Sequence, residues 1–171
     1  MFFFLVKASL KQIQIWKKIN LVDGVTTNPT LLSKEGLEPI DQLKAICKLV
    51  NGPVSAQVTE IKAEKMIKQA YQLKKISKNI VIKLPSNLEG FLAAKVLTKK
   101  KIKTNITLGF DPSQIIAFAR LNVTYFSLIL GKTEDWGFSN LTSISETKKI
   151  INNLNSKTKL LLASIRNTTH L

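Results

Sequence analysis

The stretch NIVIKLPSN, residues 79–87, sets a single lysine into a short apolar run. Ile80, Ile82 and their apolar neighbours predict a strand that is buried on both faces, as strands of parallel sheets usually are. A charged amine is costly to bury in such a strand. Lys83 therefore either reaches water at the strand end or has a chemical role, and this run alone leaves both interpretations open.

Comparable apolar runs recur along the whole chain, and amphipathic segments separate them. Together they predict strands at residues 2–6, 23–28, 54–58, 79–84, 103–108, 124–130 and 159–164. Helices are predicted at residues 9–19, 40–50, 62–76, 87–100, 111–121 and 144–154. Asn87 and Asp111 are the expected N-caps of the fourth and fifth helices. The apolar stripe of the fourth helix is expected to lie on the sheet; its members are Leu88, Phe91, Leu92 and Val96.

Alternating strands and helices predict an α/β fold with a parallel sheet. A doubly wound sheet normally has a glycine-rich turn after its first strand. Here the first strand and the residues after it read FFFLVKASL and contain no glycine. A TIM-type (β/α)8 barrel instead gathers polar side chains at the C-terminal ends of its strands. The chain has eight such residues, at or near the ends of six predicted strands, so the barrel is favoured: Thr27, Asn28, Gln57, Lys83, Asn105, Thr107, Ser127 and Ser164.

Length and composition suit one soluble globular domain spanning residues 1–171. The chain has 171 residues, of which 44% are hydrophobic, and a mean hydropathy near zero. Its one cysteine, Cys47, excludes an intramolecular disulfide framework and favours a reducing, cytoplasmic location. The opening MFFFLV is too short for a signal peptide or a membrane span.

The net charge of +15 raises the possibility of a nucleic-acid partner. The lysines, however, recur on nearly every predicted helix, with one local cluster at residues 99–101. No basic strand carries the interleaved aromatic residues that would stack on bases. This scatter favours a solvated basic surface over a nucleic-acid site.

A lysine at the end of a barrel strand can act as a nucleophile if its pKa is lowered. An amine with a pKa of about 10.4 is neutral in about one molecule in a few thousand at pH 7, whereas a pKa of about 7 makes half of the molecules neutral. The neutral amine can attack a ketone or aldehyde to form a Schiff base, which accepts electrons while a carbon–carbon bond breaks.

Six motifs, in order along the whole chain, resemble the small transaldolase and fructose-6-phosphate aldolase family. They are GVTTNPTLL (24–32), AQV (56–58), IVIKLP (80–85), TNITLGF (104–110), GKTEDWG (131–137) and LASIR (162–166). The resemblance implies a cofactor-free barrel enzyme that acts on sugar phosphates through a Schiff base on Lys83. Gln57 resembles the aldolase branch, whereas TNITLGF and GKTEDWG resemble small transaldolases, so the choice between these activities stays open.

The resemblance also implies roles for individual residues. Gln57, Lys83 and Thr107 match catalytic positions, with Thr107 helping to hold the water that relays protons. Positions that match substrate contacts are Thr27, Asn28, Asn105, Ser127, Lys132, Ser164 and Arg166. Ser164 and Arg166 match the phosphate anchor, and Lys132 stands where relatives usually have arginine. No metal site is implied.

Two further positions depart from the family pattern: Val6 stands where relatives have an aspartate, and Ile129 replaces an aromatic residue. Gln57 lies where the family has either glutamate or glutamine, and a glutamine cannot exchange a proton. A positioned acid or base is typically worth a hundredfold to ten-thousandfold in rate. We therefore expect turnover to be slow or absent.

The chain also stops after LASIRNTTHL, before the eighth strand and the C-terminal helix that relatives use to interlock into oligomers. The expected fold is thus a barrel truncated after about seven strands, in a decayed gene product or an incomplete chain. A homo-oligomer is possible, although the interlocking helix is missing. The alternative function is a non-catalytic remnant that binds sugar phosphates or nucleic acid through its basic surface.

Overall fold

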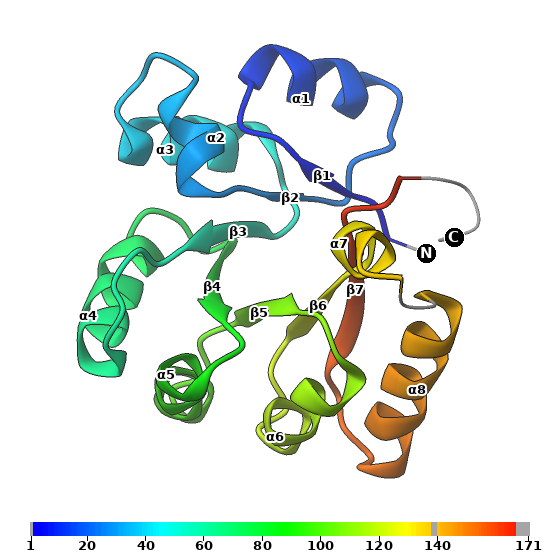
Figure 1. Ribbon diagram of the computed structural model, residues 1–171. Helices are drawn as coiled ribbons and strands as arrows, with labels where there is room; N and C mark the ends of the chain where they lie inside the picture. Colours follow the sequence, from blue (N-terminus) through cyan, green and yellow to red (C-terminus); the bar gives the residue numbers. More distant parts are fainter. Residues whose placement is uncertain (1, 138–139, 167–171) are drawn as a thin grey trace. The chain divides into compact units, whose positions relative to one another are not determined.

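Strands and helices alternate along the chain in this computed structural model, which describes residues 2–137 and 140–166 (Figure 1). The chain divides into two compact units, an N-terminal unit (Met1–Lys83) and a C-terminal unit (Leu84–Leu171). Within each unit the strands are parallel and follow the order of the chain.

The N-terminal unit has four strands, the last of which runs across the division after Lys83. The strands are β1 (Phe4–Val6), β2 (Gly24–Thr26), β3 (Val54–Gln57) and β4 (Ile80–Pro85). The helices are α1 (Leu10–Lys18), α2 (Pro29–Ser33), α3 (Pro39–Leu49) and α4 (Ala63–Lys74). Prolines at the first position of α2 and α3 suit a helix start, because that residue needs no hydrogen-bond donor.

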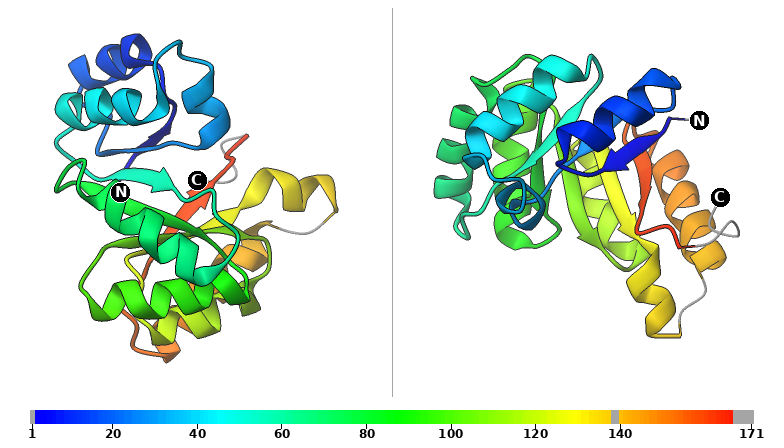
Figure 2. Two further views of the ribbon diagram at one scale, coloured as in Figure 1. Left: turned by 90° about the vertical axis from the view of Figure 1, so that its left-hand side faces the viewer. Right: turned by 90° about the horizontal axis from the view of Figure 1, so that it is seen from above.

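The C-terminal unit has three strands of its own. These are β5 (Thr104–Gly109), β6 (Tyr125–Ile129) and β7 (Lys159–Ala163). The helices are α5 (Leu88–Lys99), the 3-10 turn η1 (Pro112–Gln114), α6 (Ile115–Arg120), α7 (Leu130–Asp135) and α8 (Asn140–Asn153). The views of Figure 2 show α8 running alongside β7. Phe118 of α6 packs on Phe126 of β6, with ring centroids 6.2 Å apart, so α6 covers one face of this sheet.

Both predicted N-caps are confirmed. The side-chain oxygen of Asn87 accepts a hydrogen bond of 2.8 Å from Gly90 N, at the start of α5. Asp111 accepts one of 2.8 Å from Ser113 N, and the Gln114 side chain completes a capping box. These contacts satisfy backbone donors that a helix start leaves without partners.

The predicted buried face of α5 is wrong for Leu88, Leu92 and Val96, whereas its fourth member, Phe91, is half-buried and packs against Phe118. Leu88 is 71% exposed, Leu92 42% and Val96 38%. The buried residues lie on the opposite side of the helix and are mostly small: Gly90, Ala93, Ala94 and Leu97. A Cβ at Gly90 would overlap the carbonyl oxygen of Pro85, so α5 packs too closely against the end of β4 for larger side chains.

All seven predicted strands and all six predicted helices are present, and the fold class is confirmed as an α/β TIM-type fold with seven strands. Two short helices, α2 and α7, were not predicted, and α8 begins at Asn140 rather than at residue 144. That residues 1–171 form a single domain stays a prediction. No helix in the described part of the chain is long and apolar enough to cross a membrane.

Candidate active site

Lys83 lies near the C-terminal end of β4, opposite Gln57 of β3. The lysine is only 9% exposed. Its Nζ reaches across β3 and donates a long hydrogen bond, 3.4 Å, to the carbonyl oxygen of Thr27, the residue after β2. The amine is therefore held inside the unit instead of extending into bulk water.

Burial lowers the pKa of Lys83 from 10.5 to about 8. The cause is desolvation, which disfavours the charged form of an amine. At pH 7 an amine with this pKa is neutral in about one molecule in ten, against one in a few thousand for an ordinary lysine. The direction agrees with the prediction, and the shift stops short of a pKa of 7.

Val6 shares the face of the sheet on which Lys83 lies. Paired residues of parallel strands point the same way, and so do residues two apart on one strand. The ladder pairs Val6 with Thr26, and Thr26 with Ser55. Ser55 and Gln57 share a face, and Gln57 pairs with Lys83. A carboxylate at position 6 would thus face the same side as the amine.

Thr26 offers a hydrogen-bonding group beside position 6. It is 5% exposed, and its Oγ1 has no hydrogen-bond partner among the described residues. A buried hydroxyl without a partner costs about 1–3 kcal/mol. An acid in place of Val6 would give this hydroxyl an acceptor.

The two residues after β2 have structural contacts of their own. Thr27 is fully buried, and its hydroxyl donates to Ser55 O at 2.8 Å. The side-chain oxygen of Asn28 accepts a hydrogen bond of 2.8 Å from Leu31 N and so caps α2. The predicted substrate contacts of Thr27 and Asn28 remain predictions, and for Asn28 the cap leaves the amide nitrogen to donate.

The C-terminal unit brings three of the predicted polar residues onto one face of β5 and β6. Ser127 Oγ donates to Asn105 Oδ1 at 2.8 Å, and both side chains are buried. Thr107, two residues beyond Asn105 and 5% exposed, follows on the same face.

A bulge ends the regular part of β5 just after Thr107. The register to β6 shifts between Ile106 and Gly109, and Leu108 has a left-handed φ of 63°. Ser86, which follows β4, makes two hydrogen bonds to the bulge. Its N donates to Thr107 O at 2.8 Å, and its Oγ donates to Leu108 O at 3.1 Å. Such a bulge redirects the strand next to the predicted site, and no local sequence pattern predicts it.

The predicted phosphate anchor forms a cluster with α7. Arg166 makes an end-on ion pair with Asp135, with Nη1–Oδ1 at 2.5 Å and Nη2–Oδ2 at 3.0 Å. The hydrogen bond from Arg166 lowers the pKa of Asp135, and Lys132 lowers it further through its charge. Ser164, exposed and in a left-handed conformation with φ of 59°, directly follows β7. The sequence placed Asp135 in the GKTEDWG motif but did not predict its pairing with Arg166.

The ten predicted site residues thus fall into two groups, each at the C-terminal ends of the strands of its own unit. The N-terminal unit holds Thr27, Asn28, Gln57 and Lys83, and the C-terminal unit holds Asn105, Thr107, Ser127, Lys132, Ser164 and Arg166. No cluster of three or more potential metal ligands occurs among the described residues.

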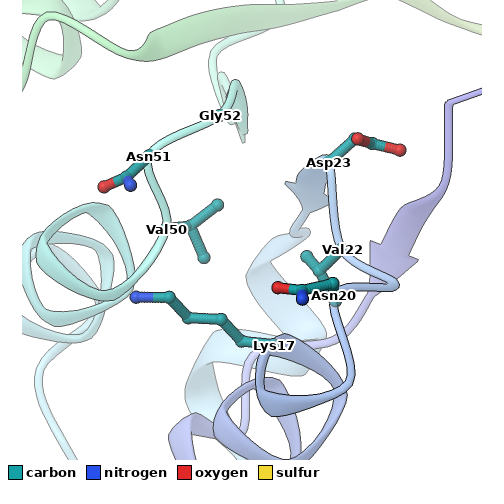
Figure 3. Close-up of a pocket in the computed structure, with 7 residues that line it drawn as sticks. All are labelled: Lys17, Asn20, Val22, Asp23, Val50, Asn51 and Gly52. Atoms are coloured by element: carbon teal, nitrogen blue, oxygen red, sulfur yellow. The ribbon is translucent and has the colours of Figure 1, made fainter.

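A hollow of about 270 Å³ lies at the other end of the N-terminal unit, where β2 and β3 begin (Figure 3). Lys17, Asn20 and Asp23 line it together with Val22 and the segment 50–52. Its residues precede the strands, whereas Lys83 lies near a strand's C-terminal end. This hollow is therefore not part of the candidate active site.

Known proteins resemble this chain over nearly its whole length. The family model described as Transaldolase/Fructose-6-phosphate aldolase matches residues 3–171. A "Probable transaldolase" of Methanococcus vannielii is 43% identical over 98% of this chain, and one of Dictyoglomus turgidum is 40% identical over 98%. A "Probable transaldolase 2" of Listeria monocytogenes is 43% identical over 99%. This chain covers 78% of the length of each of the three.

One similar solved structure is a monomeric form of the dimeric phosphoribosylanthranilate isomerase of Thermotoga maritima. The matched region covers 97% of this chain and 89% of the isomerase chain. Its TM-score of 0.45 and 12% identity are too low to carry a conclusion. The sequence relatives, by contrast, are 40–43% identical over nearly the whole chain, and the family model matches residues 3–171. On that ground, the chain belongs to the transaldolase/fructose-6-phosphate aldolase family.

Proposed function

We propose that this chain is a transaldolase-like enzyme that forms a Schiff base between Lys83 and a ketose phosphate of the fructose 6-phosphate type. The observation that carries the proposal is the buried amine, whose pKa is lowered to about 8 at the C-terminal end of β4. Family membership supports the reaction class, and the names of the relatives support transaldolase use. Release of the dihydroxyacetone unit, as in the aldolase branch, is the alternative outcome of the same chemistry.

In the proposed reaction, the neutral amine attacks the ketose carbonyl carbon, and the carbonyl oxygen gains a proton. The resulting carbinolamine loses water to give an iminium ion. A base then removes the proton of the C4 hydroxyl, the C3–C4 bond breaks, and its electron pair moves into the iminium to give an enamine and an aldehyde. The enamine either attacks a second aldehyde or is protonated and hydrolysed.

The other residues have supporting roles in this proposal. Asn105 and Ser127, joined by a hydrogen bond, would bind sugar hydroxyls, and Asn28 would do the same from α2. Thr107 would hold the water that relays protons. Ser164, Lys132 and Arg166 would receive the phosphate, for which Arg166 has the donor geometry.

We further propose that the chain forms the Schiff base more readily than it completes turnover. Carbinolamine formation needs chiefly the amine, whereas bond cleavage and enamine protonation need a positioned acid or base. Val6 cannot exchange a proton, and Gln57, the partner of Lys83 in the ladder, can orient water but cannot act as a base.

The test is reductive trapping. The protein is incubated with fructose 6-phosphate or dihydroxyacetone, reduced with borohydride and digested, and the adduct is located by mass. We expect a label on Lys83, none on Lys83→Met, and full labelling of Lys95→Met, which changes an exposed lysine of α5. Unlabelled but folded wild-type protein, or a label spread over other lysines, would contradict the proposal.

A further inference from the structure

Gly131, in the first turn of α7, lies where a side chain does not fit. A Cβ at this position would be 2.5 Å from Arg166 Nε, 2.6 Å from Ser164 Oγ and 2.8 Å from Ser164 O. Contacts below 3.0 Å force a neighbour to move, and here one neighbour is backbone. The missing side chain is thus what lets Arg166 and Ser164 approach the same point of α7.

Asp135 holds the guanidinium of Arg166 through its two terminal nitrogens, on the side away from Nε. Its two oxygens accept from Nη1 and Nη2 of Arg166, at 2.5 Å and 3.0 Å. An end-on pair of this kind takes one N–H from each terminal nitrogen and sets the plane of the guanidinium. Arg166 Nε and Ser164 Oγ both lie close to the position that a Gly131 Cβ would take, so the two groups lie beside the same point of α7.

From this geometry we infer that Gly131 and Asp135 are positioning residues that hold Arg166 and Ser164 as one receptor for the phosphate of the substrate. Neither residue contacts the phosphate itself. Gly131 sets how closely Arg166 and Ser164 approach α7, and Asp135 holds the two terminal nitrogens of the guanidinium. This inference rests on the proposed function for the identity of the ligand, a phosphate monoester.

The inference predicts an effect that depends on the phosphate group. Fructose 6-phosphate carries this group and dihydroxyacetone lacks it, while both present a ketone to Lys83. Gly131→Ala pushes Ser164 and Arg166 apart, and Asp135→Asn weakens the hold on the guanidinium. We therefore expect each variant to raise the concentration of fructose 6-phosphate that gives half-maximal labelling by about tenfold, with a much smaller change for dihydroxyacetone.

A matched control variant, Glu134→Gln, tests whether Asp135 acts through the geometry of its ion pair or only through its negative charge. Glu134 precedes Asp135 and acts on Arg166 through its charge. Glu134→Gln removes the same negative charge from the same turn of α7. If Asp135 acts through the geometry of its ion pair, Glu134→Gln should shift half-maximal labelling by fructose 6-phosphate less than twofold.

A second measurement does not depend on Schiff-base chemistry. Inorganic phosphate should raise the unfolding temperature of the wild-type protein, because a ligand that binds only the folded state stabilises it. The phosphate concentration needed for a given rise should be about tenfold higher for Gly131→Ala and Asp135→Asn, with Glu134→Gln close to wild type. Sodium chloride at equal ionic strength controls for general salt effects.

The outcomes are distinguishable. Equal losses for fructose 6-phosphate and dihydroxyacetone, or equal effects of Glu134→Gln and Asp135→Asn, overturn the inference. A wild-type protein that phosphate does not stabilise overturns it as well. Absence of labelling by either compound counts against the proposed function, and the phosphate titration of the variants then decides the inference by itself.

Discussion

Replacing Lys83 by methionine should stabilise the protein at neutral pH. The folded-state pKa of about 8 lies about 2.5 units below the ordinary value of 10.5, and one unit corresponds to 1.36 kcal/mol. Keeping the amine charged in the folded state thus costs about 3 kcal/mol at pH 7. Methionine has a similar shape and no charge, but it loses the long hydrogen bond to Thr27 O, worth about 1 kcal/mol. The net gain should be about 2 kcal/mol.

The pH dependence makes this prediction specific. Between pH 8 and pH 10.5 the unfolded state binds more protons at Lys83 than the folded state, so the stability of the wild-type protein rises with pH. Below pH 8 both states carry the proton, and the full cost is present. The advantage of Lys83→Met should therefore be constant below pH 7, shrink above pH 8 and vanish or reverse by about pH 10.5.

Urea unfolding of both proteins at pH 6, 7, 8, 9 and 10 measures the difference directly. Lys95→Met is the control, because Lys95 is exposed on α5 and its replacement should give a difference that does not vary with pH. A Lys83→Met difference independent of pH, or a wild-type protein more stable than the variant at pH 7, would refute the assignment of Lys83 as a buried amine. The result does not depend on whether the chain turns over substrate.

Three further changes test neighbouring features. Val6→Asp should raise turnover of fructose 6-phosphate by at least about a hundredfold if a missing acid limits the reaction, and unchanged steady-state rates would argue against that role. The same change should raise the pKa of Lys83, seen as a shift of the labelling rate to higher pH. Asn87→Ala should lower the free energy of unfolding by about 1 kcal/mol, measured in urea, because the cap on Gly90 N is lost. Gly90→Ala should destabilise by about 1–3 kcal/mol despite the helix propensity of alanine, since its Cβ would overlap Pro85 O, and a stabilised variant would contradict this packing.

The sequence predicted the strands well because each is a compact apolar run between turn-forming residues. It failed at α5 because large apolar residues were taken as the buried face. Leu88 and Leu92 are exposed, whereas Ala93 and Ala94 are fully buried. Where a helix packs closely on a strand, the space available decides which face is buried, and that distance is a property of the assembled structure.

In the candidate site, too, some features could be predicted from the sequence and others could not. A lysine inside an apolar strand is visible in the sequence, which left open whether the amine reaches water; the structure buries Lys83 and lowers its pKa. The pairing of Asp135 with Arg166, and the contact of Ser86 with the β5 bulge, join residues 31 and 22 positions apart. Such contacts depend on how the loops after the strands are built, for which local patterns carry little information.

The source of the Lys83 pKa shift bears on why the amine can stay reactive without an acid at position 6. The shift comes from desolvation, and no charged neighbour in the described part of the chain contributes to it. A carboxylate at position 6, facing the side of the sheet on which Lys83 lies, would favour the charged amine and oppose the shift. On the proposed mechanism, a valine at position 6 cannot carry the protons that must move after the Schiff base forms. It also does not favour the charged form of Lys83, so the neutral amine stays available. These two effects of Val6 predict that Lys83 is labelled readily while turnover is slow.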